Sequence, residues 1–177
     1  MHCGSDCHSD GQAKDMPADD FLAVAKSVAT QYNPNKVMVV ITGGDPLVRK
    51  DLAYVGSELN KMGFPWGMVS NGYALNTERF EELLNAGLKS ITISLDGLEE
   101  SHNWLRGNPH SFERASNAIK MVADNGTIVF DVVTCITQKN IHQLHEIKQH
   151  LMDIGVRHWR IFAIDPIGRA KDDPLLQ

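Results

Sequence analysis

The sequence lacks any apolar run close to the ~20 residues that a membrane-spanning helix needs, and no signal peptide precedes the first predicted helix. It also lacks an excess of basic residues, because 17 Lys and Arg stand against 22 Asp and Glu, for a net charge of −5 at pH 7. A membrane-spanning protein and a nucleic-acid-binding protein are therefore poor interpretations. We expect a cytoplasmic protein.

Cysteine is scarce, with three residues in 177. An odd count without the spacing of a disulfide framework is typical of a reducing compartment. Cys3 and Cys7 lie near the N-terminus beside His2 and His8, whereas Cys135 lies in an apolar run. We expect Cys135 to be a small core residue.

What is present is an ordinary globular composition, 42% hydrophobic and 22% charged, which suits one domain with a real core. Residues 1–17 have no periodicity and are predicted to form a loop. Five strands are expected at 37–42, 66–70, 88–95, 128–134 and 159–164, and they alternate with helices at 21–30, 49–62, 77–86, 111–124 and 141–154. This alternation predicts an α/β fold with parallel strands.

The most informative stretch is residues 37–46, which read VMVVITGGDP. A continuous apolar run predicts a strand buried on both faces, and ligands of α/β proteins bind at the carboxyl ends of such strands. Gly43 and Gly44 leave the backbone open to a ligand, Asp45 adds an acceptor, and Pro46 stiffens the exit. The alternative, of about equal weight, is that the two glycines only form a tight turn.

In the third of the five predicted strands, Thr92, Ser94 and Asp96 share one face. A closed eight-stranded barrel fills its interior with bulky branched side chains, so these polar residues indicate a wider, open cavity that holds a polar ligand. Asp131 and Arg160, charged residues within otherwise apolar strands, fit the same interpretation. A buried pair or an edge position would explain those two equally well.

Several short motifs follow one another along nearly the whole chain. They are His2-Cys3-Gly4-Ser5, Gly43-Gly44-Asp45-Pro46, Ser70-Asn71-Gly72, Ser94-Leu95-Asp96-Gly97, His102, Arg106-Gly107, Ser111-Phe112, Trp159-Arg160, Pro166 and Gly168-Arg169-Ala170. In this order and spacing they resemble the radical S-adenosylmethionine (SAM) enzymes, particularly the SPASM-type branch. The resemblance implies a partial (β/α)6 TIM-like barrel with parallel strands.

The resemblance also implies a [4Fe-4S] cluster at the C-terminal mouth of the barrel. In the family, three cysteines of a C-x3-C-x2-C loop bind the cluster, and its fourth iron binds the amino and carboxylate groups of SAM. Reductive cleavage of SAM then gives a 5′-deoxyadenosyl radical that abstracts hydrogen from a substrate. We therefore expect an iron–sulfur oxidoreductase with an electron donor such as flavodoxin or ferredoxin. Modification of a peptide or protein is the first expected role, and cofactor biosynthesis is the second.

Matched residue by residue, the resemblance makes Cys3 the third cluster cysteine and assigns Gly43, Gly44, Asp45 and Pro46 to the motif that meets the methionine amino group of SAM. It makes Ser94 a SAM-contacting residue and Asp96 a neighbour that reaches SAM or substrate, and it brings Ile164 near adenine. The family usually has Glu where this chain has Asp45. No catalytic residue is assigned, and Arg106 either binds a carboxylate or braces the Asp96 loop.

The start of the chain departs from the family pattern. If Cys3 is the third ligand, the first two cysteines and the first barrel strand precede Met1; an alternative register makes Cys3 and Cys7 the first two ligands but puts Asp10, a poor ligand, third. We therefore expect residues 1–177 to form an incomplete radical SAM core domain. Alone it would hold no complete cluster, would be inactive, and would self-associate through the edge strand at 37–42.

Two other classes of protein stay open. His2, Cys3, Cys7 and His8 are adequate ligands for tetrahedral zinc, although structural zinc motifs normally space their ligands into pairs. A non-catalytic α/β binding module is the second. A phosphate-binding version is poorly supported, because the sequence lacks both G-x-G-x-x-G and the Lys-Ser/Thr of a P-loop.

Overall fold

The computed structural model describes residues 16–165, 171 and 174–176. Its centre is one sheet of five strands in the order β1-β2-β3-β4-β5, and every neighbouring pair is parallel. The strands are β1 Val39–Ile41, β2 Trp66–Ser70, β3 Leu88–Ser94, β4 Val129–Ile136 and β5 Trp159–Ala163. The predicted α/β fold with parallel strands is confirmed.

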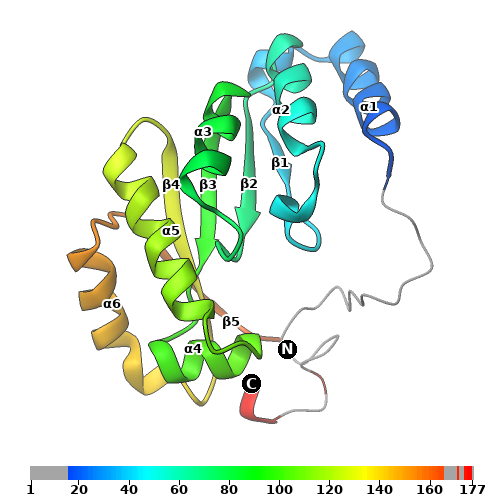
Figure 1. Ribbon diagram of the computed structural model, residues 1–177. Helices are drawn as coiled ribbons and strands as arrows, with labels where there is room; N and C mark the ends of the chain where they lie inside the picture. Colours follow the sequence, from blue (N-terminus) through cyan, green and yellow to red (C-terminus); the bar gives the residue numbers. More distant parts are fainter. Residues whose placement is uncertain (1–15, 166–170, 172–173, 177) are drawn as a thin grey trace.

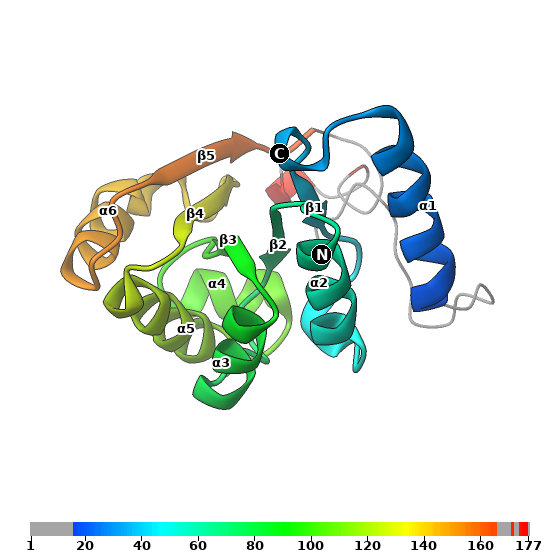
Figure 2. The same cartoon turned by 90° about the horizontal axis from the view of Figure 1, so that it is seen from above.

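Six α-helices connect and cover the strands: α1 Ala18–Gln31, α2 Leu52–Lys61, α3 Thr77–Asn85, α4 Glu99–Arg106, α5 Ser111–Asn125 and α6 Leu144–Asp153. Short 3-10 turns occupy Pro34–Lys36, Pro46–Val48, Ile141–Gln143 and Pro174–Leu176. The strands run side by side in Figure 1, and Figure 2 shows that they follow an arc with α2, α3, α5 and α6 along its outer side. Within the described residues, no helix has the length and apolar character to span a membrane.

The core lies between this outer side of the sheet and the helices. Strand residues Trp66, Met68, Ile91, Ile93 and Val132 are almost completely buried there. Each such side chain contributes roughly 1.5–3 kcal/mol through burial. Gly56 of α2 makes room for the largest of them, because a Cβ at this position would lie 2.2 Å from the Trp66 ring. The outer side of the sheet is therefore a packed core and leaves little space for a ligand.

The prediction that 37–42 is buried on both faces is wrong. β1 has only three residues, none of them is buried, and Val40 is 52% exposed. The reason is tertiary: β1 pairs with β2 alone among the described strands, and its inner face is uncovered by them. The apolar run thus forms an edge strand.

Two helical predictions also need correction. The turn Pro46–Val48 precedes α2, which therefore starts at Leu52 and not at residue 49. Helix α4 was not predicted, because its buried positions include Ser101 and His102 and give only a weak apolar pattern. This helix supplies Arg106 to the site described next.

Candidate functional site

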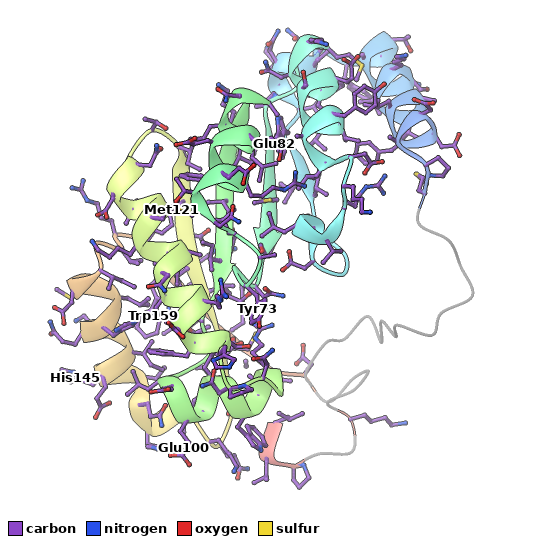
Figure 3. All side chains as sticks on the ribbon, in the orientation of Figure 1. Tyr73, Glu82, Glu100, Met121, His145 and Trp159 are labelled. Carbon is purple, nitrogen blue, oxygen red and sulfur yellow. The ribbon has the colours of Figure 1, made fainter. Side chains whose placement is uncertain are left out.

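The carboxyl ends of the strands lie together along one edge of the sheet, because all five strands are parallel. Gly43 follows the end of β1 by two residues, and Ser94 is the last residue of β3. The same edge holds the loop that links β2 to α3; Figure 3 shows Tyr73 of this loop near the strand ends. The predicted polar residues therefore share one end of the fold.

The turn at Gly43 and Gly44 presents open backbone. A Cβ built on either glycine would meet nothing within 4 Å, and both residues are exposed. Gly43 has φ +132°, a conformation that other residues rarely adopt. Room for a ligand therefore exists directly at the backbone, as the sequence predicts.

Asp45 braces this turn. Its carboxylate accepts hydrogen bonds from the backbone N–H of Leu47 at 3.0 Å, the Ser70 hydroxyl at 3.0 Å and the backbone N–H of Asn71 at 2.7 Å. These bonds tie the end of β1 to the end of β2 and cap the 3-10 turn that starts at buried Pro46. The predicted acceptor is thus engaged by the protein itself, and only the backbone of the motif stays open.

Asp96 braces the neighbouring strand end. Its side chain is completely buried; Oδ1 accepts from the Cys135 backbone N–H at 2.9 Å, and Oδ2 lies 2.6 Å from Nη2 of Arg106. The Asp96 backbone is held as well, since its N–H donates to Nδ1 of His102 and its carbonyl accepts from the Asn140 side chain.

The Asp96–Arg106 contact is close but poorly directed. Oδ2 of Asp96 and Nε of Arg106 are buried, and neither makes a directed hydrogen bond within the described residues. Of the two roles open for Arg106, bracing the Asp96 loop is the one that the structure shows. Direct contact between Asp96 and SAM stays a prediction.

Ser94 differs from these two acids. It is half-buried, and its hydroxyl makes no hydrogen bond within the part of the chain that the structure describes. A ligand at the strand ends could therefore use this hydroxyl without displacing a protein partner.

Beside the Asp96 brace lies a cavity of about 270 Å³ lined by polar side chains, namely Asn71, Tyr73, His102, Arg106, Asn108 and Ser111. Ile164 follows β5 and packs with Trp104, Leu105 and Leu176 in a small cluster separate from the main core. Its proposed neighbour, adenine, stays a prediction.

Cys135 is half-buried at the end of β4, in register with Phe162 of β5. Burial, aided by the nearby charge of Asp96, raises the pKa of its thiol to about 11. The thiol is therefore protonated at neutral pH and, as expected, resembles a small core residue more than a metal ligand.

The charged pair Asp131 and Arg160 forms a hydrogen-bonded group with Thr92 on the inner side of the sheet. The Thr92 hydroxyl donates to Oδ1 of Asp131 at 2.7 Å, while Arg160 donates from Nε to Oδ2 of Asp131 and from Nη2 to the Thr92 oxygen. The hydrogen bond to Asp131 raises the pKa of Arg160. The two charges do pair, but the Arg160 side chain is 53% exposed, so the alternative of a buried pair is wrong.

No group of three or more His, Cys, Asp or Glu side chains that could hold a metal occurs within residues 16–165, 171 and 174–176. Cys3 and the alternative zinc ligands His2, Cys7 and His8 lie outside these residues. The ligand role of Cys3 therefore stays a prediction.

Comparison with known families gives one match. A family model described as the radical SAM superfamily matches residues 1–151, most of the chain.

Curated relatives match almost all of this chain but only part of their own length. An AdoMet-dependent heme synthase of Nitratidesulfovibrio vulgaris is 29% identical over 170 residues, which are 96% of this chain and 45% of that protein. A protein named a probable GTP 3',8-cyclase from Saccharolobus islandicus is 28% identical over 170 residues, 93% of this chain and 54% of that protein. The chain thus spans about half the length of these relatives.

Solved structures share the fold. Streptococcus suis SuiB bound to the precursor peptide SuiA superimposes with a TM-score of 0.76 at 16% identity, over 93% of this chain and 36% of SuiB. The enzyme anSMEcpe with bound AdoMet gives a TM-score of 0.72 at 17% identity, over 85% of this chain and 44% of that chain. At such identities the likeness shows the fold alone, which is the expected TIM-like α/β arrangement.

Proposed function

Because this chain belongs to the radical SAM superfamily, whose enzymes use an iron–sulfur cluster and SAM, we propose that its strand ends form the SAM-binding site of an enzyme of cofactor biosynthesis. The observation that carries the proposal is the open backbone at Gly43 and Gly44, which shares one sheet edge with the unpaired hydroxyl of Ser94. When bound, the cluster and SAM supply a 5′-deoxyadenosyl radical that abstracts hydrogen from the substrate.

Each residue of the chain then has a defined role. The backbone of Gly43 and Gly44 binds the amino group of SAM, and Asp45 holds that backbone in place through its three hydrogen bonds. Ser94 contacts SAM through its hydroxyl. Asp96 acts as a positioning residue whose buried carboxylate is anchored by Arg106.

The remaining assignments come from the family pattern. Ile164 lies against adenine, and Cys3 is a thiolate ligand of the cluster, a role for which soft anionic sulfur suits iron. Pro46, buried at the first position of its 3-10 turn, fixes where the turn leaves the site.

The choice of cofactor biosynthesis over peptide modification is supported by the relatives at 25–29% identity that cover most of this chain and are named heme synthases. The structures with bound peptide are only 15–16% identical, so they speak for the fold and not for the substrate. The SPASM-type branch stays part of the proposal, supported by Trp159-Arg160 and by the Gly168-Arg169-Ala170 motif.

Two partners belong to the same proposal. Radical SAM chemistry needs one-electron reduction, so we propose a flavodoxin- or ferredoxin-like donor. The edge of β1 also favours self-association, since Met38 and Val40 are 43% and 52% exposed beside unpaired strand backbone. A Val40→Lys variant should shift the sedimentation of the 177-residue chain toward monomer, and a purely monomeric wild type would contradict this.

The SAM site is tested in the protein at its full natural length, purified without oxygen and supplied with iron, sulfide and a reductant. We expect 5′-deoxyadenosine to form from SAM. Gly44→Val should lower this at least about tenfold while the circular dichroism spectrum stays unchanged, because the new side chain enters open space. Val48→Ala, at a 73% exposed position of the following turn, is the matched control. Equal activity of Gly44→Val and wild type would refute the site.

The cluster assignment has its own test on the 177-residue chain. Cys3→Ala should reduce the iron retained after anaerobic reconstitution, whereas Cys135→Ala should not, because the Cys135 thiol is half-buried and protonated. About four irons per wild-type chain would contradict the expectation that this chain alone holds no complete cluster. Zinc at unit stoichiometry, without iron–sulfur absorption, would favour the zinc-binding alternative.

A further inference from the structure

The inner face of the sheet, opposite the helices, carries a half-exposed cation. Gly67, Ser90 and Met38 identify this face, because a Cβ on Gly67 would lie 2.1 Å from the Ser90 hydroxyl and 2.9 Å from the Met38 methyl group. Thr92 lies two residues beyond Ser90 and therefore shares its face. Arg160 joins them through its hydrogen bond to Thr92.

One edge of the Arg160 guanidinium is fixed and the other is available. A guanidinium has five N–H donors in a planar fork. Nε and one Nη2 hydrogen point to Asp131 and Thr92. The opposite edge, formed by Nη1 and the second Nη2 hydrogen, has no partner within the described residues. Two side chains thus orient the group while a bidentate edge faces the open inner side, and such an edge matches a carboxylate or phosphate.

Stability does not explain this arrangement well. Exposed ion pairs contribute little to folding, and this pair occupies three neighbouring strands at positions where apolar side chains would pack. The effect of Asp131 and Thr92 is mainly to hold Arg160 in one orientation. A fixed orientation reduces the entropy lost when a ligand binds.

The surroundings of Arg160 are apolar. Its guanidinium carbon lies 5.6 Å from the centre of the Phe162 ring, and Phe162 is 47% exposed. Val133 is its partner in register on β4. An anion bound here would therefore have an apolar or aromatic body against Phe162.

The position relative to Ser94 connects Arg160 to the strand ends. Ser94 pairs with Val133, and Val133 pairs with Arg160, so the three residues lie at one level of the sheet. Two strand spacings separate Ser94 from Arg160, which is about 10 Å. A ligand on Arg160 thus lies next to the place where the proposed function puts SAM.

We propose that the free edge of Arg160 binds the carboxylate or phosphate of the substrate, and that this substrate has an apolar body lying along the inner face. That the ligand is the substrate rests on the proposed function; that the edge binds an aromatic anion does not.

The test uses the 177-residue chain without iron, sulfide or SAM, so that failure of anion binding and failure of the SAM site are seen separately. Benzoate, phenyl phosphate and the uncharged analogue benzamide are titrated, and the Nε–Hε nuclear magnetic resonance signal of Arg160 is followed. We expect the two anions to shift this signal and to bind at least about tenfold more tightly than benzamide. The tighter of the two anions then identifies the substrate group as carboxylate or phosphate.

Variants locate the site. Arg160→Gln should weaken anion binding at least about tenfold, while Arg160→Lys should retain part of it, because the charge stays and the bidentate fork is lost. Arg157→Gln removes an exposed arginine just before β5 and should bind as the wild type does. Equal binding of benzoate and benzamide by the wild type, which requires no variant to fold, would overturn the proposal. Equal losses in the Arg157 and Arg160 variants would overturn it too.

Discussion

Removal of Arg106 should destabilise the fold strongly, because it leaves the carboxylate of Asp96 buried without its countercharge. The Asp96 side chain is 0% exposed, and that of Arg106 is 23% exposed. Breaking a buried pair by deleting one partner costs about 3–5 kcal/mol, since the remaining charge has lost water and gained nothing in return. The bond from the Cys135 N–H remains and offsets only part of this cost.

Urea unfolding followed by circular dichroism measures the effect. With a slope of about 2 kcal/mol/M, Arg106→Ala should lower the midpoint by about 2 M at pH 7. The matched control is Lys120→Ala, which breaks an exposed helical pair with Asp124 whose side chains are 59% and 65% exposed. That pair should contribute about 0.3–0.5 kcal/mol.

The double variant Asp96→Asn/Arg106→Met separates charge from packing. It removes both charges and keeps similar volumes, so most of the stability should return, to within about 1–2 kcal/mol of the wild type. If Arg106→Ala and Lys120→Ala lose equal stability, or the double variant is as unstable as the single one, the buried charge is not the cause.

Three further predictions concern single residues. Asp45→Ala leaves three donors without their acceptor and should cost about 2 kcal/mol in urea unfolding; a loss under about 0.5 kcal/mol would contradict the bracing role. Burial lowers the pKa of His150 below its usual 6.5, so the unfolded chain binds the proton more readily and stability is lost as pH falls through this lowered pKa. His150→Gln should reduce that loss between pH 7 and 5, and exposed His145→Gln should not. Site-specific alkylation of Cys135, read by mass spectrometry, should rise near pH 11, with a thiolate fraction at pH 8 about a hundredfold below that of a thiol with the ordinary pKa of 9.0; a rise near pH 9 would contradict its burial.

The sequence predicts the order and type of the strands because each is a short apolar run between turn residues. β2, for example, has the predicted bounds at both ends. Helix α4 and the exposure of β1 escape this reasoning for different reasons. The first has a buried face built partly from Ser101 and His102, and the second is an edge strand, a property of the assembled sheet and not of its own residues.

The site residues were predictable by type but not by partner. Asp45 binds Ser70, 25 positions further on, and Asp96 binds the backbone of Cys135, 39 positions further on. No local pattern reports such pairings, so a carboxylate at a strand end looks like a ligand-binding group until the fold shows what it already accepts.

These pairings also change how the shorter carboxylate at position 45 is understood. Asp45 reaches the ends of two strands at once, with bonds of 2.7–3.0 Å to Leu47, Ser70 and Asn71. A glutamate is one methylene longer and would have to fold back to make the same contacts with the 3-10 turn. The cost of Asp in place of the family's usual Glu is therefore reach toward a ligand, and the gain is a rigid backbone at Gly43 and Gly44. Because a rigid site loses less entropy on binding, this exchange leaves the backbone and the Ser94 hydroxyl as the groups that meet SAM.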